Sequence, residues 1–249
     1  MRLADKTAVI TGAAGILGQA SARRFGAEGA RLVLVDRDAP RLEALAATLD
    51  PGRSLALTVD VACAADMVQV AEAAIDRFGG IDIFFANAGI EGMAAPMQDY
   101  PDETFDKVIE VNLRGVYIGV KTMLPRMRDG GSVLMTSSIA GLMGMPLNVA
   151  YTASKHAVVG IRRACAAIAG PRGIRVNSIH PGFVDSKMLA RLVAQHADPE
   201  ASLKGMRDRA LLGRLVHPDE VANAALFLAS DESRGITNHG LVVDCGILN

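Results

Sequence analysis

The chain has 249 residues and a formal net charge of −1, and half of its residues are hydrophobic. This length is enough to bury a large core in a single α/β domain. The near-neutral charge gives no reason to expect binding to nucleic acid or to an anionic membrane surface. No apolar run reaches the roughly 18–20 residues of a transmembrane helix, and the first residues lead into a strand rather than a signal peptide. We therefore expect a soluble, cytoplasmic protein.

Three cysteines, Cys63, Cys165 and Cys245, are far apart in the chain and lack the spacing of metal ligands. Because a free cysteine behaves as a small apolar side chain, we expect all three to be buried or half-buried. Neither a catalytic thiol nor a metal site is predicted. The chain also lacks internal repeats and Pro- or Ser-rich linkers, which indicates a single domain over residues 1–249.

The first half of the chain alternates short apolar runs with segments of helical periodicity. The expected strands cover residues 6–11, 31–35, 54–59 and 81–86, and the expected helices cover 18–29, 39–49 and 64–78. A glycine turn from Gly12 to Gly18 joins the first strand to the first helix. Glycines let the backbone approach a pyrophosphate closely, and free N–H groups at the helix start bind it. Asp36 follows the second strand, where a dinucleotide fold places the carboxylate that binds the adenosine ribose.

The second half continues this alternation. Expected helices cover 101–127, 150–169 and 221–230, expected strands cover 132–136, 175–180 and 241–244, and one or two short helices form a mobile lid at about 186–213. Gly130 and Gly131 bound the strand at 132–136. Asn112 lies inside the apolar stripe of the long helix, where a buried amide needs a partner. Strands that alternate with helices predict a doubly wound, Rossmann-like parallel sheet with helices on both faces.

Tyr151 and Lys155 lie near the start of an Ala-rich helix, and Ser138 follows the strand before it. Residues at positions i and i+4 share one face of a helix, so the phenol and the ammonium can meet. A nearby positive charge favours the phenolate of a tyrosine, whose ordinary pKa is about 10, and this brings proton transfer toward neutral pH. A Tyr-x-x-x-Lys spacing alone is weak evidence, but its combination with Ser138 and the glycine turn is more specific.

In this order, the motifs resemble those of the classical short-chain dehydrogenase/reductase family over essentially the whole chain. The resemblance implies a seven-stranded sheet and a nicotinamide cofactor. It also implies that Tyr151 is the general acid/base, that Ser138 orients the substrate oxygen, and that Lys155 lowers the pKa of Tyr151 and holds the nicotinamide ribose. An Asn such as Asn112 kinks the helix in this family and holds a water that relays protons to the Lys. A structural amide bonded to backbone is the alternative role for Asn112, since both roles satisfy its burial.

The resemblance assigns further residues to dinucleotide binding. Asp60 contacts adenine, Asn87 binds the cofactor and braces the sheet, and the Val184 backbone binds the carboxamide. Ser186 contacts the carboxamide or the phosphates. The full expected set is Gly12, Gly15, Ile16, Leu17, Gly18, Asp36, Arg37, Asp60, Val61, Asn87, Ala88, Gly89, Tyr151, Lys155, Pro181, Gly182, Val184 and Ser186.

Two positions depart from the family pattern. Ile16 stands where the middle glycine of Thr-Gly-x-x-x-Gly-x-Gly is usual, and Gly15 lies one position earlier. We expect the branched side chain to crowd a pyrophosphate unless Gly15 lets the turn adjust. Ala86 replaces the first Asn of the Asn-Asn-Ala-Gly motif, whereas the second Asn is kept as Asn87.

The predicted activity is the reversible oxidation of a secondary alcohol to a ketone by an NAD-dependent enzyme. Asp36 favours NAD because its carboxylate would face the 2′-phosphate of NADP with like charge, although the adjacent Arg37 could accept that phosphate. The alternatives are an NADPH-dependent ketoreductase acting on 3-oxoacyl thioesters and a catalytically silent nucleotide-binding scaffold. Methionine-rich segments at 90–97 and 141–147 favour a mostly apolar small-molecule substrate.

His180 lies in an expected strand and is predicted to be structural rather than a second base. The helices at 101–127 and 150–169 carry more apolar and small residues than one core-facing stripe needs. Members of the family commonly pair these two helices across a two-fold axis, so the resemblance implies a homotetramer or a homodimer.

Overall fold

Seven parallel strands form one sheet, in the order β3-β2-β1-β4-β5-β6-β7. The strands are β1 (Thr7–Thr11), β2 (Arg31–Asp36), β3 (Ser54–Thr58), β4 (Ile81–Ala86), β5 (Met127–Thr136), β6 (Arg175–Pro181) and β7 (Gly240–Val243). The computed structural model describes residues 1–248. The strand order reverses between β1 and β4, and open α/β sheets bind ligands outside the carboxyl ends of their strands at such a point. The predicted doubly wound, seven-stranded fold is confirmed.

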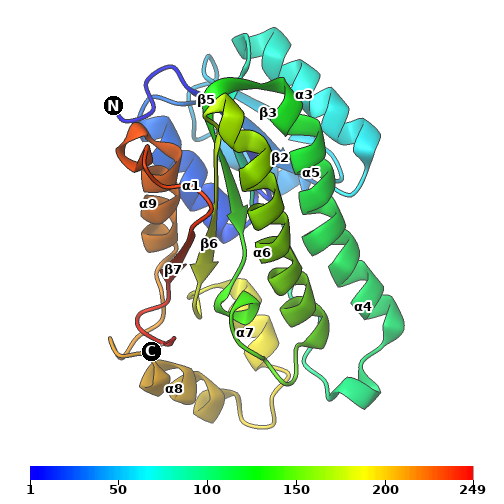
Figure 1. Cartoon of the computed structure of the whole chain (residues 1–249). Helices are drawn as coiled ribbons and strands as arrows, with labels where there is room; N and C mark the ends of the chain where they lie inside the picture. Colours follow the sequence, from blue (N-terminus) through cyan, green and yellow to red (C-terminus); the bar gives the residue numbers. More distant parts are fainter. Residues whose placement is uncertain (249) are drawn as a thin grey trace.

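Helices cover both faces of the sheet (Figure 1). One face carries α1 (Ile16–Ala27), α2 (Ala39–Ala46) and α9 (Pro218–Ala229), and the other carries α3 (Ala64–Phe78), α5 (Gly115–Met123) and α6 (Val149–Ala169). Successive residues of a strand point to opposite faces, so Val9 joins the core under α3, α5 and α6, while Ile10 joins the core under α1, α2 and α9. Because both faces are buried, the strands appear in the sequence as continuous apolar runs.

The long helix predicted at 101–127 is divided by a π-helical turn. α4 (Asp102–Ile109) is followed by the π-helical turn at Glu110–Arg114 and then by α5, and a 3₁₀ turn at Leu124–Arg126 ends the run. Asn112 lies in the middle of the π-helical turn, so the kink expected at this residue is a widened turn of helix. Such turns inside α-helices occur frequently at functional sites.

β5 is longer than predicted, because it begins at Met127 and includes Gly130 and Gly131 rather than following them. Its pairing register with β4 shifts ahead of Ser132, which marks a bulge. Gly130 has a φ of 77°, and a Cβ on Gly131 would lie 2.6 Å from the carbonyl oxygen of Asp82. The two glycines therefore allow an irregular passage within the strand and do not mark its boundary.

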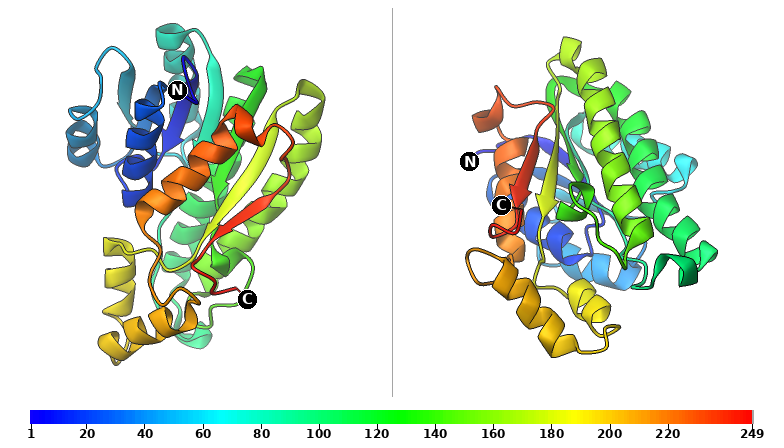
Figure 2. Two further views of the ribbon diagram at one scale, coloured as in Figure 1. Left: turned by 90° about the vertical axis from the view of Figure 1, so that its left-hand side faces the viewer. Right: turned by 60° about the horizontal axis from the view of Figure 1, so that its bottom comes forward.

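The predicted lid forms two short helices beyond the carboxyl edge of the sheet, α7 (Lys187–Val193) and α8 (Pro199–Arg209). Figure 2 shows, in its right-hand view, both helices projecting from the body of the fold. An apolar cluster fastens them to the ends of the neighbouring strands; its buried members are Ile139, Phe183, Leu189, Val193, Ala210 and Ile247. The mobility of this lid stays a prediction.

Two further features differ from the sequence-based expectations. The last helix begins earlier than predicted, at Pro218, because the His217 side chain caps it. Cys63 is exposed rather than buried, since it occupies the N-cap position of α3, whereas Cys165 and Cys245 are half-buried as expected. Within residues 1–248, no helix is long and apolar enough to cross a bilayer.

Candidate active site

The residues predicted to bind a dinucleotide gather along one edge of the sheet, because parallel strands all end at the same edge. They are Gly12, Gly15, Ile16, Leu17 and Gly18 after β1, Asp36 and Arg37 at the end of β2, Asp60 and Val61 after β3, Asn87, Ala88 and Gly89 after β4, and Pro181, Gly182, Val184 and Ser186 at the end of β6. Ser138 follows β5, and Tyr151 and Lys155 come from the first turns of α6. The structure thus brings the predicted catalytic and cofactor residues to one edge.

The glycine turn after β1 packs tightly against the segment that follows β4. Gly12 has a φ of 65°, and a Cβ there would lie 2.7 Å from the Ala88 Cα atom. A Cβ on Gly18 would lie 2.1 Å from the Gly12 carbonyl oxygen, so α1 packs directly on the turn. No side chain caps the first N–H groups of α1, whose N-cap residue is Gly15. This helix start, with free N–H groups and no side chain in the way, fits the pyrophosphate of a dinucleotide.

Ile16 begins α1, and 44% of its surface is exposed. The residue that packs closest to the turn is Gly18, while Gly15 has an ordinary extended conformation with a φ of −73°. The turn therefore closes without a glycine at position 16, and the branched side chain is directed to solvent in the protein alone. Its contact with a bound pyrophosphate stays a prediction.

Two carboxylates predicted to contact the adenosine lie at the ends of β2 and β3. Asp36 accepts hydrogen bonds from the backbone N–H groups of Ala14 (2.9 Å) and Asp38 (3.1 Å), which ties β2 to the glycine turn. Asp60 accepts a hydrogen bond from a neighbouring backbone N–H at 2.9 Å. Arg37 is exposed beside Asp36. Both carboxylates are thus fixed by backbone donors, and Asp36 is only half-buried.

Asn87 joins the ends of three neighbouring strands. Its Nδ2 donates to the carbonyl oxygens of Thr11 (3.1 Å) and Gly12 (3.3 Å), and Thr136 Oγ1 donates to its Oδ1 at 3.0 Å. The side chain therefore links β1, β4 and β5 beside the glycine turn, as the bracing role predicts. A contact between Asn87 and the cofactor stays a prediction.

Lys155 is a buried ammonium with 2% of its surface exposed. Its Nζ donates to the Thr136 carbonyl oxygen at 2.8 Å and lies 5.4 Å from the centre of the Tyr151 ring. Burial lowers its pKa to about 8, so most of the side chains still carry a charge at neutral pH. A Cβ on Gly89 would lie 3.4 Å from the Nζ atom, and the missing side chain keeps the space beside the ammonium open.

Tyr151 is half-buried one helical turn before Lys155. Burial of its hydroxyl raises its pKa to about 12, while a hydrogen bond with the Ser138 side chain lowers this pKa and the Glu91 carboxylate raises it. The resemblance implies a lowered pKa, but in the protein alone burial outweighs the neighbouring groups and the phenol is protonated at neutral pH. Ser138 Oγ also accepts a hydrogen bond from the Ala140 backbone N–H at 3.1 Å, which fixes the hydroxyl at the end of β5.

Asn112 is fully buried, and its amide is satisfied by protein groups. Its Nδ2 donates to the Ile90 carbonyl oxygen (2.9 Å) and to Ser154 Oγ (3.2 Å), and its Oδ1 accepts from the Ile90 N–H at 2.8 Å. These hydrogen bonds give the side chain a structural role. It clamps the backbone next to Gly89, and a water relay through this residue stays a prediction.

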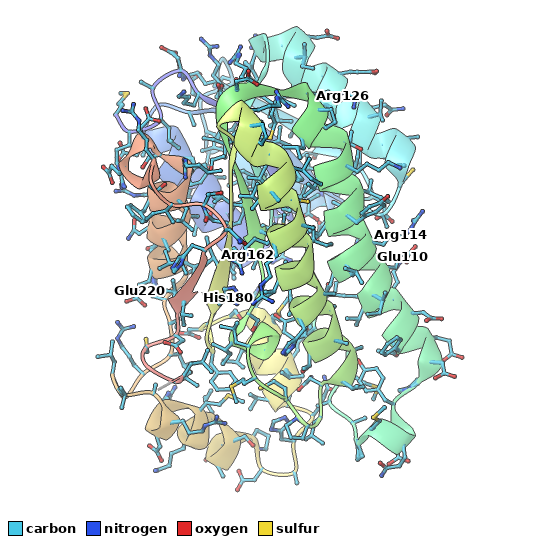
Figure 3. The ribbon with its side chains drawn as sticks, viewed as in Figure 1. Glu110, Arg114, Arg126, Arg162, His180 and Glu220 are labelled. Atoms are coloured by element: carbon cyan, nitrogen blue, oxygen red, sulfur yellow. The ribbon has the colours of Figure 1, made fainter. Side chains whose placement is uncertain are left out.

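His180 is structural, as predicted. It is 1% exposed, and its Nε2 and Nδ1 lie 2.8 Å from Ser178 Oγ and 3.0 Å from the Ser138 carbonyl oxygen. Burial lowers its pKa to about 4, so the ring is neutral at pH 7. Figure 3 shows His180 and Arg162 between α6 and β7. His180 thus supports the backbone that carries the Ser138 hydroxyl.

The segment after β6 packs against the C-terminal segment before it enters the lid. A Cβ on Gly182 would lie 2.8 Å from the Asp244 Cα atom, and Val184 pairs with Val216 in an isolated parallel bridge. The Ser186 hydroxyl accepts a backbone N–H and caps α7. The expected carboxamide-binding segment therefore leads directly into the first helix of the lid.

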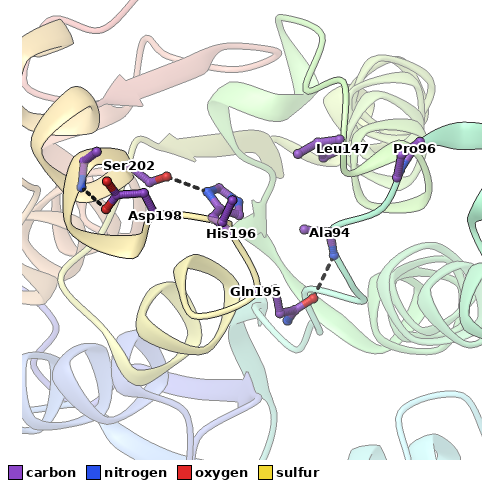
Figure 4. Close-up of a pocket in the computed structure, with 9 residues that line it drawn as sticks. Ala94, Pro96, Leu147, Gln195, His196, Asp198 and Ser202 are labelled. Atoms are coloured by element: carbon purple, nitrogen blue, oxygen red, sulfur yellow. Dashed lines mark hydrogen bonds between the residues drawn. The ribbon is translucent and has the colours of Figure 1, made fainter.

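Glu91 is a site residue that the sequence did not single out. It lies two residues after Gly89, and its carboxylate accepts hydrogen bonds from Arg191 of α7. A cavity of about 620 Å³ opens beside this loop, between Ala94, Leu147 and the segment after α7 (Figure 4). No sequence spacing links Glu91 to Arg191, because the two residues come from opposite walls of the site.

The chain also matches known proteins over almost its whole length. Residues 12–248 match the sequence model of a family described as enoyl-(acyl carrier protein) reductase. A levodione reductase from Leifsonia aquatica is 38% identical, with 98% of this chain and 95% of the relative covered. The chain belongs to the classical short-chain dehydrogenase/reductase family. It is accordingly an oxidoreductase of a family that uses NAD(H) or NADP(H).

Other members of the short-chain dehydrogenase/reductase family are similar to the same extent. A D-threitol dehydrogenase from Mycolicibacterium smegmatis is 37% identical, covering 98% of this chain and 94% of the relative. The 3-oxoacyl-[acyl-carrier-protein] reductase FabG of Thermotoga maritima is 34% identical over all of both chains. The crystal structure of levodione reductase superposes with a TM-score of 0.94 at 36% identity, covering 98% of each chain.

We predict that the buried charge of Lys155 makes the stability of this short-chain dehydrogenase/reductase rise with pH. The pKa of Lys155 is about 8 in the folded protein and 10.5 in the unfolded chain, so the folded protein binds the ammonium proton less tightly. Below pH 8 the buried charge therefore lowers the free energy of unfolding, and this loss disappears as the pH rises toward 10.5. Relative to Lys155→Met, the wild type should gain about 3 kcal/mol of unfolding free energy over this window. Urea denaturation at several pH values measures the difference, and a constant difference would contradict the assignment.

Proposed function

We propose that this protein is an NAD-dependent oxidoreductase that interconverts a mostly apolar secondary alcohol and its ketone. The observation that carries the proposal is the meeting of Ser138, Tyr151 and Lys155 at the same sheet edge as the glycine turn. A proton-transfer group and a dinucleotide cradle side by side are what reversible alcohol oxidation requires.

Each of these residues has a role that follows from its surroundings. Ser138, fixed at the end of β5, donates a hydrogen bond to the substrate oxygen and orients it. Tyr151 gives its proton to a ketone oxygen during reduction, and its high pKa keeps the phenol protonated for this step. In oxidation the phenolate of Tyr151, which the Lys155 ammonium stabilises, takes the alcohol proton and becomes the neutral phenol again. The nicotinamide, when bound, accepts or returns the hydride.

Asp36 supports NAD over NADP. Its half-buried carboxylate is fixed by two backbone donors at the end of β2, where the adenosine ribose is expected. A 2′-phosphate there would meet a like charge that cannot easily move away. Arg37 is exposed beside it and favours the phosphate.

The surroundings of the site support a mostly apolar substrate. Met143 and Met145 pack on the apolar cluster of the lid. Among the polar side chains nearby, Glu91 and Arg191 bind each other, and Asn148 donates to a backbone carbonyl oxygen. The cavity next to this loop is also lined by polar side chains, but they bind other protein groups: Gln195, His196, Asp198 and Ser202. This leaves fewer polar groups for the several hydroxyls of a sugar.

A second candidate is an NADPH-dependent reductase of 3-oxoacyl thioesters, which the similarity to FabG over the whole chain favours. Recognition of a thioester carrier calls for free cations at the mouth of the site. Arg191 is held by Glu91, which leaves the exposed Lys187 as the cation at the start of the lid. A catalytically silent scaffold would have no need for this acid–base group beside a dinucleotide cradle.

Assembly as a homotetramer or homodimer is also part of the proposal. Exposed apolar side chains lie on the two long helices, such as Tyr117 (53% exposed) on α5 and Ile168 (67%) on α6. Apolar side chains that adjoin one another on the surface of a folded protein usually mark an interface. Helix-to-helix pairing of two subunits would cover it.

Replacing Tyr151 with Phe should remove nearly all turnover, by about 100-fold or more, while NAD binding stays close to normal. The change deletes only the hydroxyl that transfers the proton. Steady-state kinetics and NADH-binding titrations measure the two quantities. Tyr117→Phe, which removes the hydroxyl of an exposed tyrosine outside the predicted catalytic set, is the matched control and should keep full activity. More than a tenth of wild-type activity in Tyr151→Phe would rule out this role.

The kcat/KM for NAD should exceed that for NADP by roughly 100-fold or more, because juxtaposed like charges cost several kcal/mol. Asp36→Asn keeps the shape of the side chain but removes its charge, so it should reduce the ratio of kcat/KM for NAD to kcat/KM for NADP. Equal kcat/KM values for the two cofactors in the wild type would contradict the choice of NAD.

Among substrates, kcat/KM should rise with apolar size, from propan-2-ol to a cyclic or aryl secondary alcohol. An apolar wall gains affinity with each buried carbon, at about 25 cal/mol per Å² of surface. A panel of alcohols read by NADH absorbance gives the series. A flat or falling series, or a clear preference for polyols or acyl thioesters, would reject the apolar substrate.

A further inference from the structure

The lid helix α7 is fastened to the loop after β4 by two side-chain contacts. Arg191 donates to Glu91 Oε1 from Nε (3.0 Å) and from Nη2 (2.9 Å). Gln195, which follows α7, accepts a hydrogen bond from the Ala94 N–H at 3.0 Å (Figure 4). The first contact is between two charges and the second between neutral groups. The loop and the lid therefore meet through one ion pair and one hydrogen bond.

The two charges of the ion pair differ in their surroundings. The Glu91 side chain is 16% exposed, whereas that of Arg191 is 64% exposed. Glu91 directly follows Ile90, which Asn112 holds at both its N–H and its carbonyl oxygen. Asn112 also donates to Ser154 Oγ, and this hydroxyl donates to the Tyr151 carbonyl oxygen. Glu91 thus belongs to the wall of the site that is joined to α6, and Arg191 belongs to the lid. A movement of α7 would carry Arg191 away from Glu91, which would stay on the wall of the site.

This placement matters for Tyr151 because the Glu91 carboxylate disfavours a phenolate beside it. The charged groups that face Tyr151 are Lys155 on its own helix and Glu91 on the loop after β4, and Glu91 is bound by Arg191 of α7. Ser138, which follows β5, contributes a neutral hydroxyl. A negative charge at Glu91 raises the pKa of Tyr151, and a guanidinium bound to that carboxylate offsets part of the effect.

We propose that Arg191 is a positioning residue, which supplies from the lid the positive charge that lets Tyr151 ionise beside Glu91. The ion pair then couples closure of α7 to proton transfer, because Tyr151 gives up its proton more readily while the lid is closed than while it is open. This inference rests on the proposed function, in which Tyr151 is the acid/base group. It assigns a role to two residues that the predicted catalytic set does not include.

The test replaces each charge in turn and follows the titration of Tyr151. Glu91→Gln should lower the pKa of Tyr151 by about half a pH unit or more, since it leaves Arg191 as an uncompensated positive charge. Arg191→Met should raise the same pKa, since it leaves Glu91 uncompensated. In the double variant, the pKa of Tyr151 should lie between the values of the two single variants. Carbon-13 NMR of the protein without cofactor, labelled at tyrosine Cζ, reports ionisation, and Tyr151→Phe identifies the signal among the three tyrosines.

Gln195→Met is the matched control, because it loosens the same lid contact without changing a charge. It should raise KM and leave the pKa of Tyr151 unchanged, whereas Arg191→Met should raise KM and also move the pH profile of kcat for alcohol oxidation to higher pH. Shifts of the same sign in Glu91→Gln and Arg191→Met, no shift in either, or an equal shift in Gln195→Met would overturn the inference. Full activity of Tyr151→Phe would instead refute the proposed function, and the NMR titration would still test the ion pair.

Discussion

The buried ammonium of Lys155 is the constraint on which the rest of the site depends. A charge that is 2% exposed must be stabilised by nearby oxygens, and the acceptor found in this chain is the carbonyl oxygen of Thr136 at 2.8 Å. One acceptor only partly replaces water, so the pKa of the side chain falls to about 8. The site thus keeps a cation that is ready to bind further oxygens, such as ribose hydroxyls or a phenolate.

The neighbours of Lys155 are arranged around this cation. Thr136, whose carbonyl binds the ammonium, also donates its hydroxyl to Asn87, which reaches across to the glycine turn through Gly12. On the other side, Asn112 fixes the backbone beside Gly89, and the absence of a side chain there leaves room for the ammonium. A continuous set of hydrogen bonds therefore connects the dinucleotide cradle with the acid–base residues. Loosening any member would displace both.

Much of this arrangement could be predicted from the sequence. The parallel strands are buried on both faces and appear in the sequence as apolar runs, from which the positions of the strands can be predicted. The polar residues that follow these runs, among them Asp36, Asn87 and Ser138, are then predicted to lie at the carboxyl ends of the strands. The spacing of Tyr151 and Lys155 put both on one face of a helix, which the structure confirms. These features depend on local periodicity and on strand order.

Other features have no local signal. The π-helical turn around Asn112 adds a residue to one turn of helix without disturbing the apolar pattern, so the segment looked like one continuous helix. The high pKa of Tyr151 results from burial in the folded protein, which the charge of a neighbouring Lys does not reveal. The pairing of Glu91 with Arg191 joins residues on opposite walls of the site, and only the tertiary structure brings them together.

The most direct measurement of the central claim follows a deuterium atom. Cyclohexanol deuterated at its carbinol carbon is oxidised with NAD, and the reduced cofactor is analysed by proton NMR. If Tyr151 handles the proton while the hydride passes directly to the nicotinamide, the deuterium should appear at C4 of the reduced cofactor, on one of its two faces. Deuterium lost to solvent, or reduced cofactor without deuterium at C4, would contradict the account.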